Sequence, residues 1–288
     1  MKKMPQFLIA GIIVGLPALA VVVDTARAEG HGPVFGLATP TLGKGQVSSD
    51  TVLMQIETDE GTRYMAREML GYGITEDVQA SLTFPLEKRG DPLTNPPRTR
   101  FGAIMGAFGD VEGSLLWRFH RVAPAVGTRY ESTLILGAGV PTDSKRAGAN
   151  VGPSFNAGVV TGYASRTSYW WLGAGYQRYF EDDDDRLGDL TYLSAVWGYR
   201  PPIFQRDYPK PDWRIFIEAL AEHSQRDRIN GVDNPNSGGK KLLIGPSVLG
   251  LYGSWGVSAG VLFPVSQELN GQQFDEKYRT KLVFTYWF

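Results

Sequence analysis

The chain has no cysteine, only three histidines, and no second long hydrophobic run beyond its N-terminal region. The absence of cysteine excludes disulfides, thiol chemistry and cysteine-ligated metal sites. The histidines do not have a metal-binding spacing, and no Gly-x-Ser-x-Gly motif is present. The formal net charge is −1, so there is no basic excess of the kind that binds nucleic acid.

The N-terminus has the organisation of an export signal. Two lysines at positions 2 and 3 precede an apolar run over 7–23, and Ala26-Arg27-Ala28 follows as a small-x-small cleavage site. We expect residues 1–28 to be a cleaved signal peptide, with 18–20 as a weaker cleavage site. An uncleaved anchor is the alternative, although the run is shorter than the roughly 20 residues that a membrane helix needs.

The last strand of the chain alternates between two kinds of residue. Phe288, Tyr286, Phe284, Leu282 and Tyr278 fall on one face, and Trp287, Thr285, Val283, Lys281, Arg279 and Lys277 fall on the other. An apolar aromatic face opposite a charged face fits a strand with lipid outside and water inside. Phe284, Tyr286 and Phe288 also resemble the C-terminal insertion signal of bacterial outer-membrane barrels. The alternative is an edge strand of a soluble protein.

The same alternation recurs through the chain. It predicts strands near 47–58, 63–74, 78–86, 111–119, 130–140, 155–163, 168–180, 187–200, 212–225, 240–251, 255–265 and 277–288. One face of each strand suits lipid, and we expect the lumen face to be small or polar. The predicted fold is all-β: an antiparallel up-and-down transmembrane β-barrel of about twelve strands over 46–288. Residues 29–45 then form a lead segment that stays in the periplasm or enters the lumen as a partial plug.

Two predictions about strands are weaker than the others. Arg67 and Glu68 are neighbours, so one of them must face outward unless it lies beyond the lipid. The Pro-rich connection over 200–211 is long for the periplasmic side, where barrels have short turns, and it leaves open a miscounted strand pair.

Some stretches resemble a known family. Residues 109–111 lead into Leu-Leu-Trp-Arg-Phe at 115–119, and a later strand ends in Gly-Val-Pro-Thr-Asp at 139–143. Together with 31–45, they resemble the outer-membrane "transporter" proteins of the meta-pathway of phenol degradation group. Family members usually have Pro-Thr-Gly where this chain has Pro-Thr-Asp. The resemblance implies a barrel that passes small solutes, with aromatic or hydrophobic compounds as the first substrate class.

Charged residues on the predicted inward faces are the first candidates for function. They are Glu112, Arg118, Arg129, Glu131, Arg214, Glu218, Glu222, Arg279 and Lys281. Opposed walls of carboxylates and guanidinium groups orient polar solutes in a narrow pore. The structural alternative is that these charges pair with one another and fill the lumen, because a buried charge needs a partner.

Two other polar features have simpler explanations. The acidic run over 182–185 has oxygen ligands that suit Ca²⁺ or Mg²⁺, but a solvated loop explains it equally well. His223 and Ser224 are neighbours, as an outer-membrane phospholipase would need from a Ser–His pair. Neighbouring side chains in a strand point to opposite faces, however, so we do not expect an enzyme.

His31 is a hypothetical copper ligand. Cleavage after Ala28 would leave Glu29-Gly30-His31 at the mature N-terminus. The terminal amine, two amide nitrogens and the imidazole could then bind Cu(II) in a square plane, which is the only cofactor that we consider. Chance placement in a tail is the alternative. Mass spectrometry of the exported protein tests this first, since any other mature N-terminus removes the site.

These features predict an outer-membrane channel of a Gram-negative bacterium for passive passage of small solutes. Its expected partners are outer-membrane lipid, lipopolysaccharide, the barrel-insertion machinery and the solute itself. A non-conducting structural or binding barrel is the alternative, and a lipid-acting barrel enzyme is a third hypothesis.

The C-terminal pattern gives a testable prediction. Removing Phe288, or replacing it with Asp, should sharply reduce the amount of assembled barrel in the outer membrane, because the terminal aromatic residue is part of the predicted insertion signal. Heat-modifiable mobility of the membrane fraction on gels measures folded barrel. Normal amounts of folded protein after either change would contradict the prediction.

Overall fold

The computed structural model describes residues 32–86, 110–142, 145–146, 149–205 and 210–288. Twelve long strands make up most of these residues. They are β1 Val47–Thr58, β2 Thr62–Gly73, β3 Val78–Pro85, β4 Asp110–Val122, β5 Arg129–Pro141, β8 Ser154–Ala164, β9 Ser168–Tyr179, β10 Leu190–Tyr199, β11 Asp212–Ser224, β14 Gly239–Tyr252, β15 Trp255–Leu269 and β16 Glu276–Trp287. In the described part of the chain, no helix has the length and apolarity that crossing a membrane requires.

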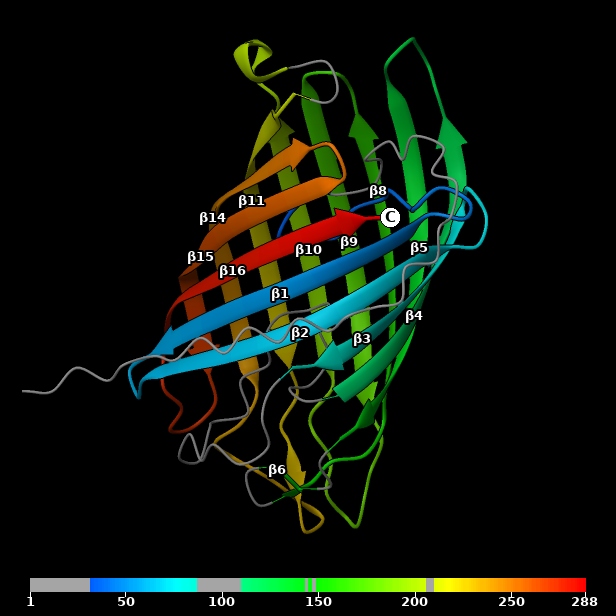
Figure 1. The fold of residues 1–288 in the computed structure, drawn as a ribbon. Helices are drawn as coiled ribbons and strands as arrows, with labels where there is room; N and C mark the ends of the chain where they lie inside the picture. The colour runs from blue at the N-terminus through cyan, green and yellow to red at the C-terminus, as the bar shows by residue number, and fades with distance from the viewer. Residues whose placement is uncertain (1–31, 87–109, 143–144, 147–148, 206–209) are drawn as a thin grey trace, which may run out of the picture.

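The twelve strands form one closed antiparallel barrel (Figure 1). Each strand pairs with its neighbours in sequence, and β1 pairs with β16 from Ser48 opposite Trp287 to Thr58 opposite Glu276. That last pair closes the ring, so no long strand keeps an open edge. The predicted fold class, an up-and-down barrel of about twelve strands, is therefore confirmed.

Side chains alternate between the two faces of the wall. In β10, Leu193 and Trp197 are exposed on the outside, whereas Leu190, Tyr192 and Val196 are buried inside. Exposed aromatic residues form two outer belts, as in barrels that cross membranes. One belt has Tyr72, Trp117, Phe119, Tyr130, Trp197, Tyr199, Trp213, Tyr252, Trp255 and Phe288, and the other has Tyr64, Phe155, Tyr176, Phe180 and Phe263.

The two ends of the barrel differ. At one end, here called the turn end, lie the C-terminus and the connections at 74–77, 123–128, 165–167, 200–211 and 253–254. The other end, the loop end, has the longer connections and two small hairpins, β6 Lys145–Arg146 with β7 Ala149–Asn150, and β12 Arg228–Ile229 with β13 Val232–Asp233. Asn230 and Gly231 join β12 to β13 with φ of 49° and 74°, which the tight turn between these strands requires.

Both of the weaker strand predictions now have an answer. In β2, Arg67 points inward and Glu68 outward, where Glu68 accepts hydrogen bonds from Ser49 Oγ and Thr51 Oγ1 at 2.5 and 2.8 Å. In the connection over 200–211, the described residues form the short 3-10 helix η1, Pro202–Phe204, and no further strand. The long turn therefore does not hide a strand pair in its described part.

The register of β15 gives a prediction about the wall. Ala259 faces outward, and Ser258 is buried on the inner face. Ala259→Arg should destabilise the folded barrel by about 2–4 kcal/mol if that position lies near the bilayer midplane. Ser258→Arg should be tolerated better and should alter conductance instead.

Urea unfolding in lipid vesicles measures the first effect, and planar-bilayer recording measures the second. Reversed effects of the two substitutions would place β15 one residue out of register.

Candidate functional site

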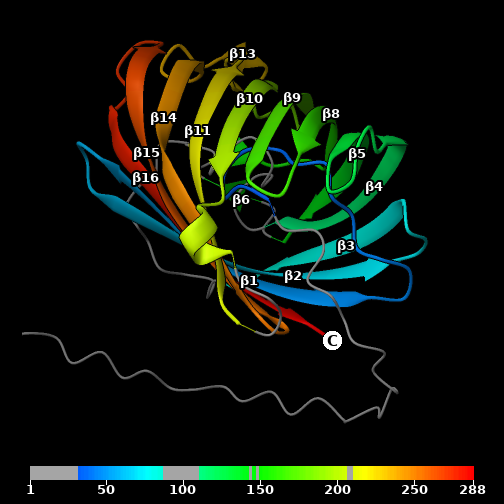
Figure 2. The same cartoon turned by 90° about the horizontal axis from the view of Figure 1, so that it is seen from above.

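The lumen contains part of the chain itself. The segment before β1 runs inside the ring of strands (Figure 2), and we call its residues 32–42 the plug segment. Val34, Phe35, Leu37 and Leu42 are buried there in one apolar cluster with inward residues of the wall. Of the two positions expected for the lead segment, the structure therefore has the one inside the lumen.

Side chains of the wall bind the main chain of the plug segment. The Glu218 carboxylate on β11 accepts the N–H groups of Val34, Phe35 and Gly36 at 2.8, 2.8 and 2.7 Å. The Val34 carbonyl accepts a hydrogen bond from Lys281 Nζ on β16 at 2.5 Å. These bonds compensate for burial of the peptide groups, which would otherwise cost free energy.

Further contacts follow along the segment. Ser194 Oγ accepts the Leu37 N–H at 3.2 Å, and Gln79 Oε1 accepts the Leu42 N–H at 2.9 Å. These partners lie on β10 and β3, on different sides of the ring. The plug segment is therefore fixed to several strands rather than to one.

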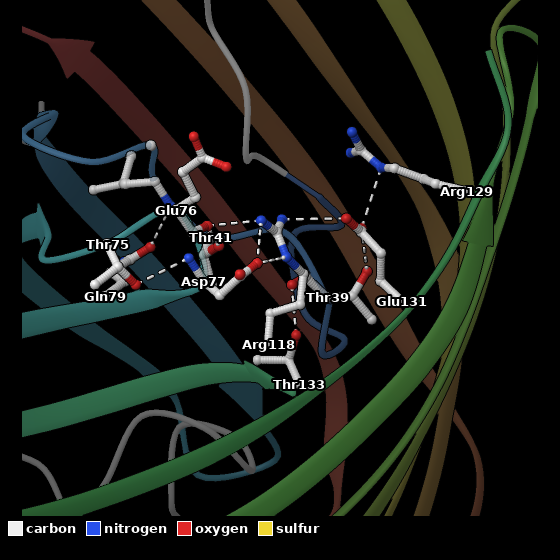
Figure 3. A network of polar contacts seen from close by, with 12 residues as sticks. Thr39, Thr41, Thr75, Glu76, Asp77, Gln79, Arg118, Arg129, Glu131 and Thr133 are labelled. Atoms are coloured by element: carbon white, nitrogen blue, oxygen red, sulfur yellow. Dashed lines mark hydrogen bonds and ion pairs between the residues drawn. The ribbon is translucent and has the colours of Figure 1, made fainter. Parts of the chain in front are cut away.

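Thr39 is the central residue of a polar network (Figure 3). Its hydroxyl donates to Glu131 Oε2 at 3.1 Å and accepts from Trp171 Nε1 at 3.1 Å. Its carbonyl accepts from Thr133 Oγ1 at 2.6 Å. Thr39 is 1% exposed, so the network holds a polar residue inside the protein without an unsatisfied group.

Ion pairs extend this network toward the turn end. Arg118 contacts Glu131 at 3.2 Å and Asp77 at 2.8 Å, and it donates to the Glu76 carbonyl at 2.6 Å. Arg129 also contacts Glu131, at 3.1 Å. Two guanidinium groups therefore face two carboxylates, and the charges of this cluster balance.

A second cluster lies at the other end of the lumen. Arg279 contacts Glu222 at 3.0 Å and Glu276 at 2.8 Å, and Lys241 contacts Glu276 at 2.8 Å. Arg279 and Glu276 are 0% and 1% exposed. Buried charges of this kind are tolerated only when they are paired and hydrogen-bonded, as they are here.

All nine charges that the sequence places in the lumen lie at inward positions of their strands: Glu112, Arg118, Arg129, Glu131, Arg214, Glu218, Glu222, Arg279 and Lys281. Glu112 contacts Arg67 at 3.4 Å, and Arg214 contacts Asp212 at 3.3 Å. Eight of them thus bind an opposite charge or, for Lys281, a carbonyl. Glu218 alone among them binds only main-chain N–H groups and the Ser247 hydroxyl in the described part of the chain.

The expected small or polar lumen face is wrong for part of the wall. Tyr169, Trp171 and Phe216 are buried on the inner face, with ring centroids 5.7 to 6.4 Å apart. Ile135, Val160 and Leu262 are buried on that face as well. These apolar residues pack against the plug segment and against one another, which a water-filled lumen would not require.

β16 departs from strict alternation at its start. Lys277 does not share the inner face with Arg279; Glu276 does, because the pairing of β16 with β1 shifts between Glu57 and Thr58. Lys277 instead contacts Asp59 at the loop end, at 3.0 Å. A one-residue shift of this kind moves the following side chain to the other face.

The remaining sequence predictions are placed as follows. Phe284 and Phe288 are exposed on the outside, and Tyr286 packs between Trp255 and Phe288, with centroids 4.3 and 4.8 Å away. Their role in insertion stays a prediction. His31 and residues 1–28 lie outside the described residues. His223 is exposed on the outer face of β11, and Ser224 has the opposite orientation.

The acidic run forms a tight turn at the loop end. Asp182 and Asp185 pair across it, and Asp183 and Asp184 have φ of 53° and 63°. Asp185 accepts the N–H groups of Asn150 and Asn230, both at 2.7 Å. Within the described residues, no three acidic or histidine side chains are grouped so that they could hold a metal ion.

Comparison with known proteins was informative only at the level of structure. No family model matches the chain, and no curated protein matches it. An outer membrane channel from Pseudomonas putida F1 has a similar structure, with a TM-score of 0.61, 12% identity, and coverage of 89% of this chain and 100% of that one. The NanC porin gives a TM-score of 0.49 at 9% identity, covering 83% of this chain and 98% of its own. The first likeness supports the fold, at an identity too low to transfer a function.

The Arg279 cluster gives a prediction about stability. Arg279→Met should destabilise the folded barrel by about 3–5 kcal/mol, because it leaves two buried carboxylates without their guanidinium partner. Urea unfolding in vesicles measures the change. Lys277→Met, a change of the same type at an exposed neighbouring position, should have no measurable effect, and equal effects of the two variants would contradict the prediction.

Proposed function

We propose that the chain forms an outer-membrane channel of a Gram-negative bacterium, through which small solutes pass passively when the plug segment moves aside. The observation that carries this proposal is a closed barrel with an apolar outside and a segment of its own chain inside the lumen. Selection would depend on pore width and on the charges of the wall.

The outer surface supports a position in a membrane. Its exposed apolar residues and two aromatic belts are what a barrel presents to lipid and to the two interfaces. Closed barrels also satisfy the main-chain hydrogen bonds of all their strands without water. The turn end would face the periplasm and the loop end the exterior.

The plug segment supports a channel with a closed resting state. It is bound by side chains rather than by strand pairing, and it makes few main-chain contacts to any one strand. Its removal would leave all twelve strand pairs intact, since none of its residues belongs to the barrel. A segment of this kind can move without unfolding the wall.

The inner wall supports an aromatic or hydrophobic solute, as the resemblance to the phenol-degradation group suggests. Tyr169, Trp171 and Phe216 give an aromatic surface next to the plug segment. Stacked or edge-on contacts with such rings favour planar apolar groups. Polar walls on either side, with balanced charges, would admit small dipolar groups on the same solute.

One observation favours a second candidate, a non-conducting structural or binding barrel. Most of the inward charges are paired with one another, and the plug segment is buried by more than one strand. Such a filled lumen would serve stability alone. Conductance separates the two candidates directly.

The plug segment gives the decisive prediction. A Cβ added at Gly36 would lie 2.4 Å from Val196 Cγ2, so Gly36→Val should weaken docking of the segment without altering the wall. We expect larger or more frequent single-channel openings in planar bilayers. Gly113→Val is the matched control, since a Cβ at Gly113 meets nothing within 4 Å, and it should leave conductance unchanged.

A Gly36→Val barrel that folds normally and conducts no better than the unmodified protein would favour the structural barrel. Heat-modifiable mobility confirms folding of both variants before recording.

A further inference from the structure

The compensation of charge at Glu218 differs from that at the other lumen carboxylates. Glu131, Glu222 and Glu276 each contact arginine or lysine at 2.8 to 3.2 Å. Glu218 is equally buried, at 1% exposed, but among the described residues no lysine or arginine lies within ion-pairing distance. Three N–H groups of the plug segment and the Ser247 hydroxyl are its donors.

Successive main-chain N–H groups that converge on one oxygen pair act together as a partial positive charge. Val34, Phe35 and Gly36 therefore occupy a place that a cation would also satisfy. Lys281 does not take this place, because its ammonium group donates to the Val34 carbonyl instead. When the plug segment leaves, Glu218 loses three of its four donors.

The surroundings of Glu218 are apolar and aromatic. A Cβ built at Gly36 would lie 2.4 Å from Val196 Cγ2 and 3.5 Å from Glu218 Oε2, so this part of the plug segment touches both. Phe216 precedes Glu218 by two residues on the same face of β11, and its ring lies 6.2 Å from that of Trp171. A buried carboxylate beside aromatic rings is a favourable environment for an organic cation.

We propose that Glu218, with Val196, Phe216 and Trp171, is a binding site for a protonated amine on an aromatic or apolar body, and that the plug segment occupies this site in the closed state. The inference rests on the proposed function, since it names the solute class of that lumen. The amine donates to the Glu218 carboxylate as the three main-chain N–H groups do, and its apolar part replaces Phe35 and Leu37.

Three probes of one shape test the site: 2-phenylethylamine, which is a cation at neutral pH, neutral 2-phenylethanol, and 3-phenylpropionate. Their binding to the Gly36→Val barrel in lipid nanodiscs is measured by titration calorimetry, which requires no current. We expect the amine to bind about tenfold or more tightly than either other probe, the range that a charge-assisted hydrogen bond gives. Adding Glu218→Gln should abolish this preference.

Glu68→Gln is the matched control, because Glu68 is a hydrogen-bonded carboxylate on the outer face of the wall. In the Gly36→Val background it should leave the preference unchanged. Equal binding of the three probes, or a preference that survives Glu218→Gln, would overturn the proposal. The proposed channel function fails separately, if Gly36→Val does not raise conductance.

A measurement on the unmodified chain avoids dependence on variants that fold poorly. Saturating 2-phenylethylamine should speed hydrogen exchange at the Val34, Phe35 and Gly36 amides, because the amine competes with them for Glu218. The alcohol should have little effect on these amides. Exchange that the amine leaves unchanged would show that it does not enter this site, and would overturn the proposal.

Discussion

The pairing of β1 with β16 is the contact on which the rest of the structure depends. Strand N–H and C=O groups facing lipid have no water to bond with, so a sheet can cross a membrane only when its two edges meet. Closure also fixes which side chains face the lumen, because each strand can present only alternate residues to it. The inner charges, the aromatic cluster and the plug segment are consequences of that ring.

A closed ring of twelve strands leaves an interior that must be filled or hydrated. This chain fills much of it. Arg118 and Glu131, and Arg279 and Glu222, neutralise one another across neighbouring strands, and apolar residues such as Trp171 pack against Leu37 of the plug segment. Glu218 is the exception, because its compensation comes from a segment that can leave. The least independent charge of the wall therefore lies where the closed and open states differ.

Alternation in the sequence was sufficient to predict the barrel, its strand number and the inward position of all nine charges, since a period of two is a local property. It could not predict the apolar inner cluster, because Val160 or Leu262 on a lumen face has a meaning only once the plug segment is known to pack there. Partners across the ring, such as Glu222 for Arg279, were equally hidden, since 57 residues separate them in the chain. The odd parity of Glu276 depends on a register shift that no composition reveals.

The central claim is that movement of the plug segment controls passage through the lumen. The chain has no cysteine, and a Cβ built at Gly173 lies 3.0 Å from Leu37 Cβ, near the separation of about 3.8 Å that a disulfide needs. The double variant Leu37→Cys with Gly173→Cys can therefore lock the segment to β9. Single-channel recording should find openings abolished by oxidant and restored by reductant. Equal conductance of the oxidised and reduced forms would contradict the claim.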